Sequence, residues 1–223
     1  MVSQVATTFV MRGKMTQFKK YKTEQERFWA GEFGSEYIQR NDGDAALASN
    51  LNFFSTILKS ARDLRSCTEF GANIGINLKA LKLLYPDIEL QAVEINADAV
   101  KQLSEIVPLS AIHHKSILEF ESESTCDLTL IKGVLIHINP DELPLVYDKL
   151  VASSHRYLLV AEYYNPTPVN ITYRGHADRL FKRDFAGEIM EKYPQLKLID
   201  YGFVYHKDPS FPQDDLTWFL LEK

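Results

Sequence analysis

The sequence predicts an α/β fold in which a mixed sheet of seven strands is covered by helices on both faces and preceded by an N-terminal helical cap. Three observations lead to this prediction. From residue 64 onward, short apolar runs with strand character alternate with helical patterns. A turn containing two glycines joins the first strand to a helix. The last two strands are separated by a segment with two prolines and no helical pattern, so they must pair antiparallel.

The composition is that of a globular chain. Of the 223 residues, 45% are hydrophobic and 25% are charged, which suffices for an α/β domain with a proper core. The formal net charge of −5 lacks the basic excess of nucleic-acid-binding proteins, so we expect no nucleic-acid partner. We expect Cys67 and Cys126 to be small buried hydrophobes, and no metal site is indicated.

No apolar run approaches the roughly 18 residues of a transmembrane helix, so we expect no membrane partner. Residues 1–14 lack the pattern of a signal peptide, and a cytoplasmic protein is the resulting expectation. We expect residues 1–15 to form a loose extension, residues 16–62 a helical cap or lid, and residues 63–223 the main domain.

Two helical patterns are expected within the cap. Thr23 and Glu26 have the spacing of a capping box that opens a helix, and residues 45–59 form a second amphipathic pattern. Between them, residues 28–41 are dense in aromatic residues and glycine. One interpretation is a lid over a cofactor. The alternative is a packing helix whose aromatic side chains fill the core. The lid interpretation assigns cofactor contacts to Trp29, Tyr37 and Arg40.

Residues 64–77 are interpreted as a strand, a glycine turn and the start of a helix. Gly71 and Gly75 permit backbone angles that a β-carbon would block. A helix that begins at such a turn presents free N–H groups and the positive end of its dipole. The turn therefore suits an anion or the polar part of a nucleotide-like cofactor. The alternative is an ordinary strand–turn–helix with no ligand.

The turn differs from a dinucleotide fingerprint, which would have the pattern G-x-G-x-x-G. Here Glu69, Gly71, Asn73 and Gly75 form the pattern E-x-G-x-N-x-G, and Asn77 follows. The middle glycine, which lets a pyrophosphate touch the backbone, is replaced by Asn73. The acid at position 69 would repel phosphate but suits a cationic ammonium group.

The second strand, residues 88–94, ends at an acid. Glu94 lies 23 residues after Gly71, where a carboxylate can accept both hydroxyls of a ribose. This spacing occurs in both NAD-binding and S-adenosylmethionine (SAM)-binding folds, and a solvated surface acid is the alternative. Ile95 follows as a further expected cofactor contact.

Cofactor contacts are also expected after the next two strands. Residues 109–114 form the third strand, and the side chains that follow it, Ser116 and Ile117, are expected around an adenine ring. Residues 126–131 form the fourth strand. Ligands of open α/β sheets bind beyond the carboxyl ends of the strands, so residues 132–137 should face the cofactor. The residues assigned there are Lys132, Gly133, Val134 and His137.

A fifth strand at residues 157–162 leads into a long aromatic and basic loop, residues 163–185. Its basic groups suggest an acceptor that bears a carboxylate or phosphate. A solvated loop with a few buried aromatic residues is the alternative. The expected substrate contacts are Glu162, Tyr163, Tyr164, Asn165, Tyr173, Arg174 and His176. A helix at residues 184–192 and the antiparallel strands 196–205 and 214–221 complete the fold.

With these residues assembled, the chain resembles the Rossmann-like (class I) SAM-dependent methyltransferases over roughly residues 60–223. Their first motif is usually E/D-x-G-x-G-x-G, and their sheet order is 3-2-1-4-5-7-6. The segments W-A-G-E-F-G-S-E-Y-I-Q-R-N, E-F-G-A-N-I-G-I-N and K-G-V-L-I-H-I-N-P-D-E-L are together similar to methylases associated with pseudaminic acid biosynthesis. The resemblance implies SAM as cofactor and a small-molecule acceptor, an acidic sugar or sugar nucleotide of a bacterial surface glycan pathway. It implies nothing about oligomeric state.

Methyl transfer needs a base only when the acceptor is a hydroxyl or a protonated amine, and His137 and His176 are the candidates. Two alternative functions stay open at this point. One is an NAD-dependent oxidoreductase, which shares the ribose-binding acid. The other is a non-catalytic protein that binds SAM and interacts with partner enzymes.

Overall fold

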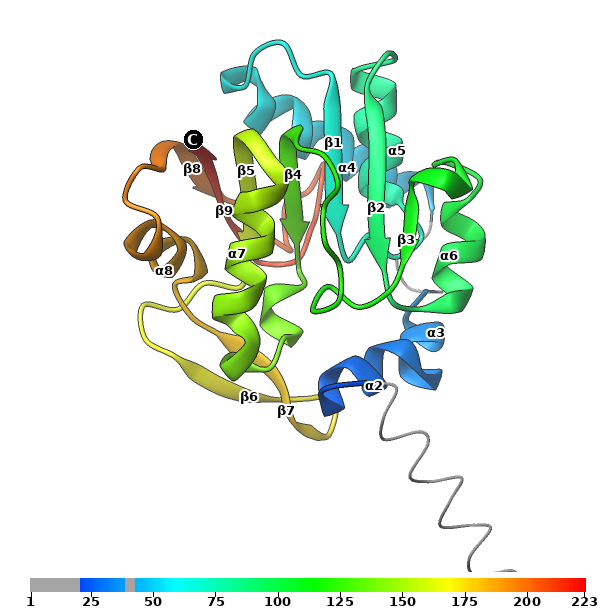
Figure 1. Ribbon diagram of the computed structural model, residues 1–223, viewed down its shortest axis with the longest axis vertical. Helices are drawn as coiled ribbons and strands as arrows, with labels where there is room; N and C mark the ends of the chain where they lie inside the picture. The colour runs from blue at the N-terminus through cyan, green and yellow to red at the C-terminus, as the bar shows by residue number, and fades with distance from the viewer. Residues whose placement is uncertain (1–20, 39–42) are drawn as a thin grey trace, which may run out of the picture.

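The computed structural model describes residues 21–38 and 43–223 (Figure 1), so the predicted extension at residues 1–15 and the predicted contact Arg40 lie outside the described residues. Seven strands form one sheet in the order β3-β2-β1-β4-β5-β9-β8. Their bounds are β1 Ser66–Phe70, β2 Glu89–Glu94, β3 Ile112–His114, β4 Cys126–Lys132, β5 Ser154–Glu162, β8 Lys197–Phe203 and β9 Thr217–Glu222.

The pairing of these strands confirms the predicted fold class. Strands β1 to β5 pair in parallel, whereas β9 pairs antiparallel with both β5 and β8. The predicted order 3-2-1-4-5-7-6 numbered the strands of the main sheet alone. The observed labels differ from it because two further strands, β6 and β7, form a separate small sheet between β5 and β8 in the chain.

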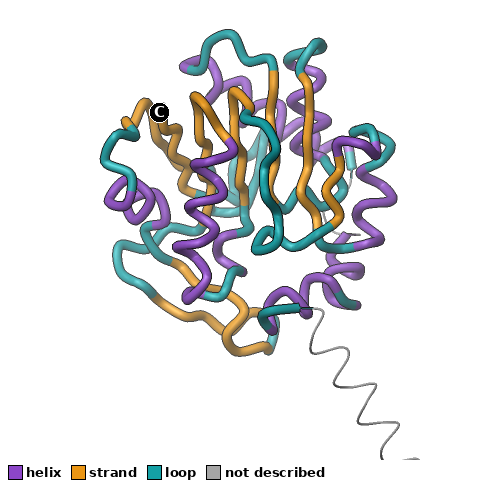
Figure 2. The backbone as a smooth tube through the Cα atoms, in the orientation of Figure 1, coloured by secondary structure: helices purple, strands orange, loops and turns teal. Residues whose placement is uncertain are grey.

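Helices cover both faces of the sheet (Figure 2). Helices α4, α5 and α6 lie on one face, where Phe54, Leu81 and Leu103 belong to one core cluster. Helices α7 and α8 lie on the other face, with Leu150 and Ile189 in a second cluster. The helix bounds are α2 Glu24–Ala30, α3 Glu32–Ile38, α4 Asp44–Ile57, α5 Ile76–Leu84, α6 Ala97–Leu103, α7 Leu143–Ser153 and α8 Phe185–Lys192; the short 3-10 helices are η1 Leu58–Ser60, η2 Leu109–Ala111, η3 Leu135–His137 and η4 Pro140–Glu142.

Strand β5 shows why the sequence predicts a doubly covered sheet. Its apolar residues alternate between the two clusters: Leu159 packs with the first, and Leu158 and Val160 with the second. Successive side chains of a strand point to opposite faces, so an unbroken apolar run needs helices on both sides. Cys67 and Cys126 are buried free thiols, as predicted.

The N-terminal helices lie in two different places, over the ends of the strands and in the core. In α2, Thr23 and Glu26 form the predicted capping box, with Glu26 N donating to Thr23 Oγ1 at 3.1 Å and Thr23 N donating to Glu26 Oε2 at 2.7 Å. Helices α2 and α3 lie across the carboxyl ends of the strands (Figure 1). Helix α4, which the sequence groups with this cap, instead packs into the core through Phe53, Phe54 and Ile57.

The segment predicted as a loop at residues 163–185 contains a β-hairpin. Strands β6 (Val169–Tyr173) and β7 (His176–Lys182) pair antiparallel. Arg174 and Gly175 join them, with φ of 51° and 82°. Two positive φ values are what a type I′ hairpin turn requires. The sequence did not reveal this turn because arginine rarely takes a left-handed conformation.

The hairpin lies beside α2 (Figure 1), where Gln25 Nε2 donates to Asp178 O at 3.0 Å. Among residues 21–38 and 43–223, no helix combines the length and apolar character needed to cross a membrane.

Candidate functional site

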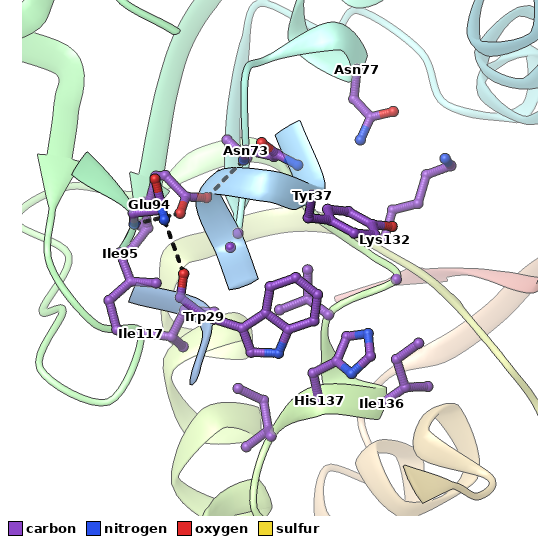
Figure 3. Close-up of a pocket in the computed structure, with 18 of the residues that line it drawn as sticks. Trp29, Tyr37, Asn73, Asn77, Glu94, Ile95, Ile117, Lys132, Ile136 and His137 are labelled. Carbon is purple, nitrogen blue, oxygen red and sulfur yellow. Dashed lines mark hydrogen bonds between the residues drawn. The ribbon is translucent and has the colours of Figure 1, made fainter. Parts of the chain in front are cut away.

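A cavity of about 360 Å³ opens at the carboxyl ends of β1, β2 and β4 (Figure 3). Residues of helices α2 and α3 line one part of the cavity, and residues of the connection between β8 and β9 line another. The cavity brings together most of the predicted contacts: Trp29, Tyr37, Gly71, Asn73, Asn77, Glu94, Ile95, Ser116, Ile117, Lys132, Gly133, Val134, His137, Tyr163 and Tyr173.

The glycine turn between β1 and α5 has the geometry that its sequence predicts. Gly71 has φ +76°, and a β-carbon there would lie 2.6 Å from Val134 Cγ2. Gly75, the N-cap of α5, has φ +82°. Asn73 also takes a left-handed conformation, with φ 50°. Asparagine tolerates this region better than most residues, so Asn73 can replace the middle glycine of the motif.

Glu94 ends β2 with its carboxylate in the cavity wall (Figure 3). Its Oε2 accepts Asn73 N and its Oε1 accepts Asn96 N, both at 2.7 Å. Burial raises its pKa, and the two N–H donors oppose that rise. Each carboxylate oxygen can accept a further hydrogen bond, so the group remains able to receive two hydroxyls.

Glu69 lies behind the turn rather than in the cavity wall, with 1% of its surface exposed. Its Oε1 accepts Asn77 Nδ2 at 2.6 Å, while its Oε2 has no partner among the described residues. Burial raises its pKa to about 8, although Asn77 and Lys132 favour the charged form. The acid is thus poised to ionise when a cation comes near.

Unpartnered polar atoms gather around the cavity. Among the described residues, the buried side-chain atoms without a hydrogen bond are Gln25 Oε1, Trp29 Nε1, Glu69 Oε2, Asn73 Oδ1, Asn77 Oδ1, Arg179 Nε and Gln213 Oε1. Five of these seven belong to residues that line the cavity. Buried polar groups normally have partners, and four of the five atoms are acceptor oxygens. They indicate a ligand that donates several hydrogen bonds.

Lys132 brings a cation to the end of β4. Its Nζ lies 5.5 Å from the ring centroid of Phe53, beside the apolar core. Burial lowers its pKa, while the nearby acids Glu69, Asp214 and Glu162 oppose this effect. In Figure 3 its ammonium lies on the same side of the cavity as Asn77.

His137 lies at the end of η3 and is also buried. Its Nδ1 is 2.6 Å from Arg179 O, on the β7 strand. Burial lowers the pKa of His137 to about 4, with the bond to Arg179 opposing. Its ring centroid lies 4.5 Å from that of Trp29. The imidazole is therefore neutral at pH 7 and packed beneath the cap.

Several predicted substrate contacts do not reach the cavity. Glu162 is 2% exposed, and its carboxylate accepts Val134 N at 2.9 Å and Leu135 N at 2.8 Å. Burial raises its pKa to about 7, opposed by these N–H groups. It therefore supports the turn that carries His137, and its role as a substrate contact stays a prediction. Burial of a strand-end acid cannot be deduced from its position in the sequence.

The other predicted residues outside the cavity wall are on or near the hairpin. Tyr164 is 42% exposed, and Asn165 donates Nδ2 to Thr167 O at 2.6 Å. Arg174 is exposed at the tip of the hairpin, where its left-handed conformation directs the chain into β7. His176 lies in β7 opposite Tyr173, and its side chain is outside what the structure describes.

Other lining residues were missed by the sequence interpretation. They come from α2, from α4, from the residues between η3 and η4, and from the β8–β9 connection: Gln25, Ser49, Asn50, Asn139, Gln213, Asp214 and Leu216 among others. Asp214 also raises the pKa of Tyr163, after the larger effect of burial. The two prolines of this connection indicated only a non-helical segment, so no motif pointed to its role. Within the part of the chain that the structure describes, no cluster of three or more potential metal ligands occurs.

Comparison with known proteins finds structural relatives without sequence relatives. No family model and no curated protein matches the sequence. The fold is similar to that of magnesium protoporphyrin IX methyltransferase (ChlM) from Synechocystis PCC 6803 with bound SAM. The TM-score is 0.61 and the identity 10%, over 90% of this chain and 98% of that one.

Two further solved structures show the same likeness. The 1,6-didemethyltoxoflavin-N1-methyltransferase of Burkholderia thailandensis, with S-adenosylhomocysteine (SAH), gives a TM-score of 0.64 at 12% identity, covering 86% of this chain and 85% of that one. The N-methyltransferase NodS from Bradyrhizobium japonicum WM9, with SAH, gives 0.59 at 13% identity, covering 85% and 97%. At such low identity these likenesses show the fold, which is that of Rossmann-like methyltransferases.

Proposed function

We propose that this protein is a SAM-dependent methyltransferase that acts on a small molecule. The observation that carries the proposal is the cavity itself. It joins the glycine turn, the acid Glu94 and a set of unpartnered acceptor oxygens at the carboxyl ends of the parallel strands. The fold shared with methyltransferases adds support.

The residues present fit SAM in three places. Asn73 Oδ1 and Asn77 Oδ1 line the cavity at the glycine turn without partners, and the ammonium of the methionine part would supply N–H donors there, with the buried acid Glu69 behind the turn. Glu94 would accept the ribose hydroxyls. The expected adenine neighbours Ser116 and Ile117 and the expected cofactor contact Ile95 form part of the same cavity wall.

The charges around the cavity also favour this cofactor. When bound, SAM supplies an electrophilic methyl group on a positively charged sulfonium. Glu69 and Glu94 lie at the ends of β1 and β2, and their raised pKa values fall when a cation binds beside them. The chain's own residues then bind and orient the two reactants, and positioning alone can contribute on the order of 7–11 kcal/mol.

A small acceptor is consistent with the size of the cavity and with the substrates in the names of two structural relatives, magnesium protoporphyrin IX and 1,6-didemethyltoxoflavin. An acidic sugar or sugar nucleotide of a surface glycan pathway remains a prediction from the family resemblance. In the basic loop that motivated it, two arginines pair with acids of the chain itself. Arg179 pairs with Glu24, and Arg183 with Glu188. Lys115 and Lys132 are the basic residues that line the cavity among the described residues.

The alternative of an NAD-dependent oxidoreductase is tested in the same experiment as the proposal. Calorimetric titrations with SAM, SAH and NAD should show binding of the two adenosyl ligands and none of NAD. Binding of NAD alone would overturn the assignment. Turnover with any acceptor would exclude a purely non-catalytic role.

A further inference from the structure

The imidazole of His137 is held in one defined tautomer. Its Nδ1 lies 2.6 Å from the main-chain oxygen of Arg179. A carbonyl oxygen can only accept a hydrogen bond, so Nδ1 must carry the proton. Nε2 therefore keeps its lone pair, and no described residue donates a hydrogen bond to it. Because the ring lines the cavity, this lone pair is available to a ligand (Figure 3).

The wall next to His137 offers a matching donor. The indole of Trp29 packs at 4.5 Å between ring centroids, and its Nε1–H is buried without a partner. Tyr173 also lines the cavity and packs against His137, with a distance of 5.1 Å between ring centroids. One acceptor nitrogen and one free N–H on the same wall suit a hydroxyl group, which both donates and accepts a hydrogen bond.

The side chain of Arg179 connects β7, the strand that carries the carbonyl group in contact with His137, to helix α2 of the cap. Its Nη2 lies 3.1 Å from Glu24 Oε2, and its guanidinium stacks 5.4 Å from the ring centroid of Phe28. A second tie joins Gln25 Nε2 to Asp178 O at 3.0 Å. Contacts of the Arg179 side chain and of Asp178 O with α2 thus hold the segment of β7 whose Arg179 carbonyl meets His137.

We propose that Arg179 is a positioning residue whose main-chain carbonyl holds His137 as the Nδ1–H tautomer, and that Nε2 of His137 takes the proton of a neutral hydroxyl acceptor. This inference rests on the proposed function. The acceptor O–H bond breaks and its proton goes to Nε2 as the oxygen forms a bond to the methyl carbon. The carbon–sulfur bond of the sulfonium breaks, and its electron pair stays on sulfur as a neutral thioether. The imidazolium then returns its proton to water.

The chemical class follows from the need for a base. A hydroxyl is un-ionised at neutral pH and becomes a good nucleophile only as it loses its proton. A carboxylate is already ionised and has no proton to give to Nε2. The arrangement at His137 and Trp29 therefore favours an alcohol or phenol over a carboxylate as the acceptor.

The tautomer can be measured without an acceptor. Long-range ¹H–¹⁵N correlation spectra of the ¹⁵N-histidine-labelled full chain, with His137→Gln to identify the signals, report which ring nitrogen is protonated. We expect a neutral ring with the proton on Nδ1 at pH 7. An Nε2–H tautomer or a charged imidazolium would overturn the proposal.

The role of Arg179 is tested with a matched arginine elsewhere. Arg156 also stacks on an aromatic ring, at 4.7 Å from the Tyr157 centroid, and donates to a main-chain oxygen, but it lies at the amino end of β5. We expect Arg179→Ala to populate the Nε2–H tautomer and Arg156→Ala to leave the spectrum of His137 unchanged. If Arg179→Ala fails to fold, Glu24→Gln weakens the same tie. An unchanged tautomer in the folded variant refutes the positioning role.

The acceptor class is tested on the SAH complex with phenol and its methyl ether, anisole. Phenol should shift the Nε2 signal of His137 because it donates a hydrogen bond, and anisole should not. No shift with phenol, or equal shifts with both, overturns the hydroxyl assignment. If SAH does not bind at all, the proposed function fails, whereas the tautomer measured on the free protein still decides the role of Arg179.

Discussion

Replacing Glu94 with alanine should weaken cofactor binding by a defined amount. The carboxylate is buried, and each of its oxygens can accept one ribose hydroxyl besides the N–H group of Asn73 or Asn96. Hydrogen bonds to a charged group contribute about 1.5–3 kcal/mol. Since 1.4 kcal/mol corresponds to a factor of ten, the loss of one such bond should raise the Kd for SAH about 10- to 150-fold, and the loss of both should raise it further.

The assay is a calorimetric titration of SAH at pH 7.5 with wild type, Glu94→Ala and the control Glu89→Ala. Glu89 lies on the same strand but is exposed at its amino end, far from the cavity. Urea unfolding of each variant should accompany the titration, because loss of Glu94 leaves two backbone N–H groups unpaired and lowers the free energy of unfolding by about 1–3 kcal/mol per group. A folded Glu94→Ala variant whose Kd changes less than about twofold would refute the ribose assignment.

Three further predictions concern the turn and the core. Gly71→Val should abolish SAH binding in calorimetry, because its β-carbon would lie 2.6 Å from Val134 and its φ is +76°; unchanged affinity would contradict the site. Burial raises the pKa of Glu69 from 4.5 to about 8, so between these values the folded protein holds a proton that the unfolded chain has lost. The free energy of unfolding should therefore fall as the pH rises from 4.5 to 8, by up to about 1.4 kcal/mol per pH unit. Urea unfolding at pH 5 and pH 8 should show that the free energy of unfolding changes less with pH in Glu69→Gln than in wild type. An equal change in the two proteins would contradict this reasoning. Phe54→Ala should cost about 3–5 kcal/mol in chemical unfolding because Phe54 is fully buried, and a loss below 1 kcal/mol would show that the core is not packed as described.

The features that the sequence predicts well are those with a local physical cause. The glycine turn needs left-handed backbone angles at Gly71 and Gly75, and both residues have them. Strand β5 is apolar on both faces, and helices cover both. The antiparallel end of the sheet follows from a connection too short and too rich in proline for a crossover helix.

The features that the sequence did not predict depend on long-range contacts. The hairpin β6–β7 turns at Arg174, a residue with no preference for positive φ. Its strand β7 is held in place by hydrogen bonds with Gln25 of α2 and His137 of η3. Glu162 stands at a strand end like Glu94, yet its carboxylate turns inward to the N–H groups of residues 134–136. Only the folded backbone distinguishes these two acids.

The central claim is that SAM occupies the cavity at the carboxyl ends of β1 and β2. Backbone amide chemical-shift mapping during a titration with SAH tests it most directly. We predict that the largest shifts fall in three segments: residues 71–77, 94–96 and 116–118, which line or border the cavity. Shifts confined to the exposed β8 edge around Tyr201 and Phe203, or no shifts at all, would contradict it.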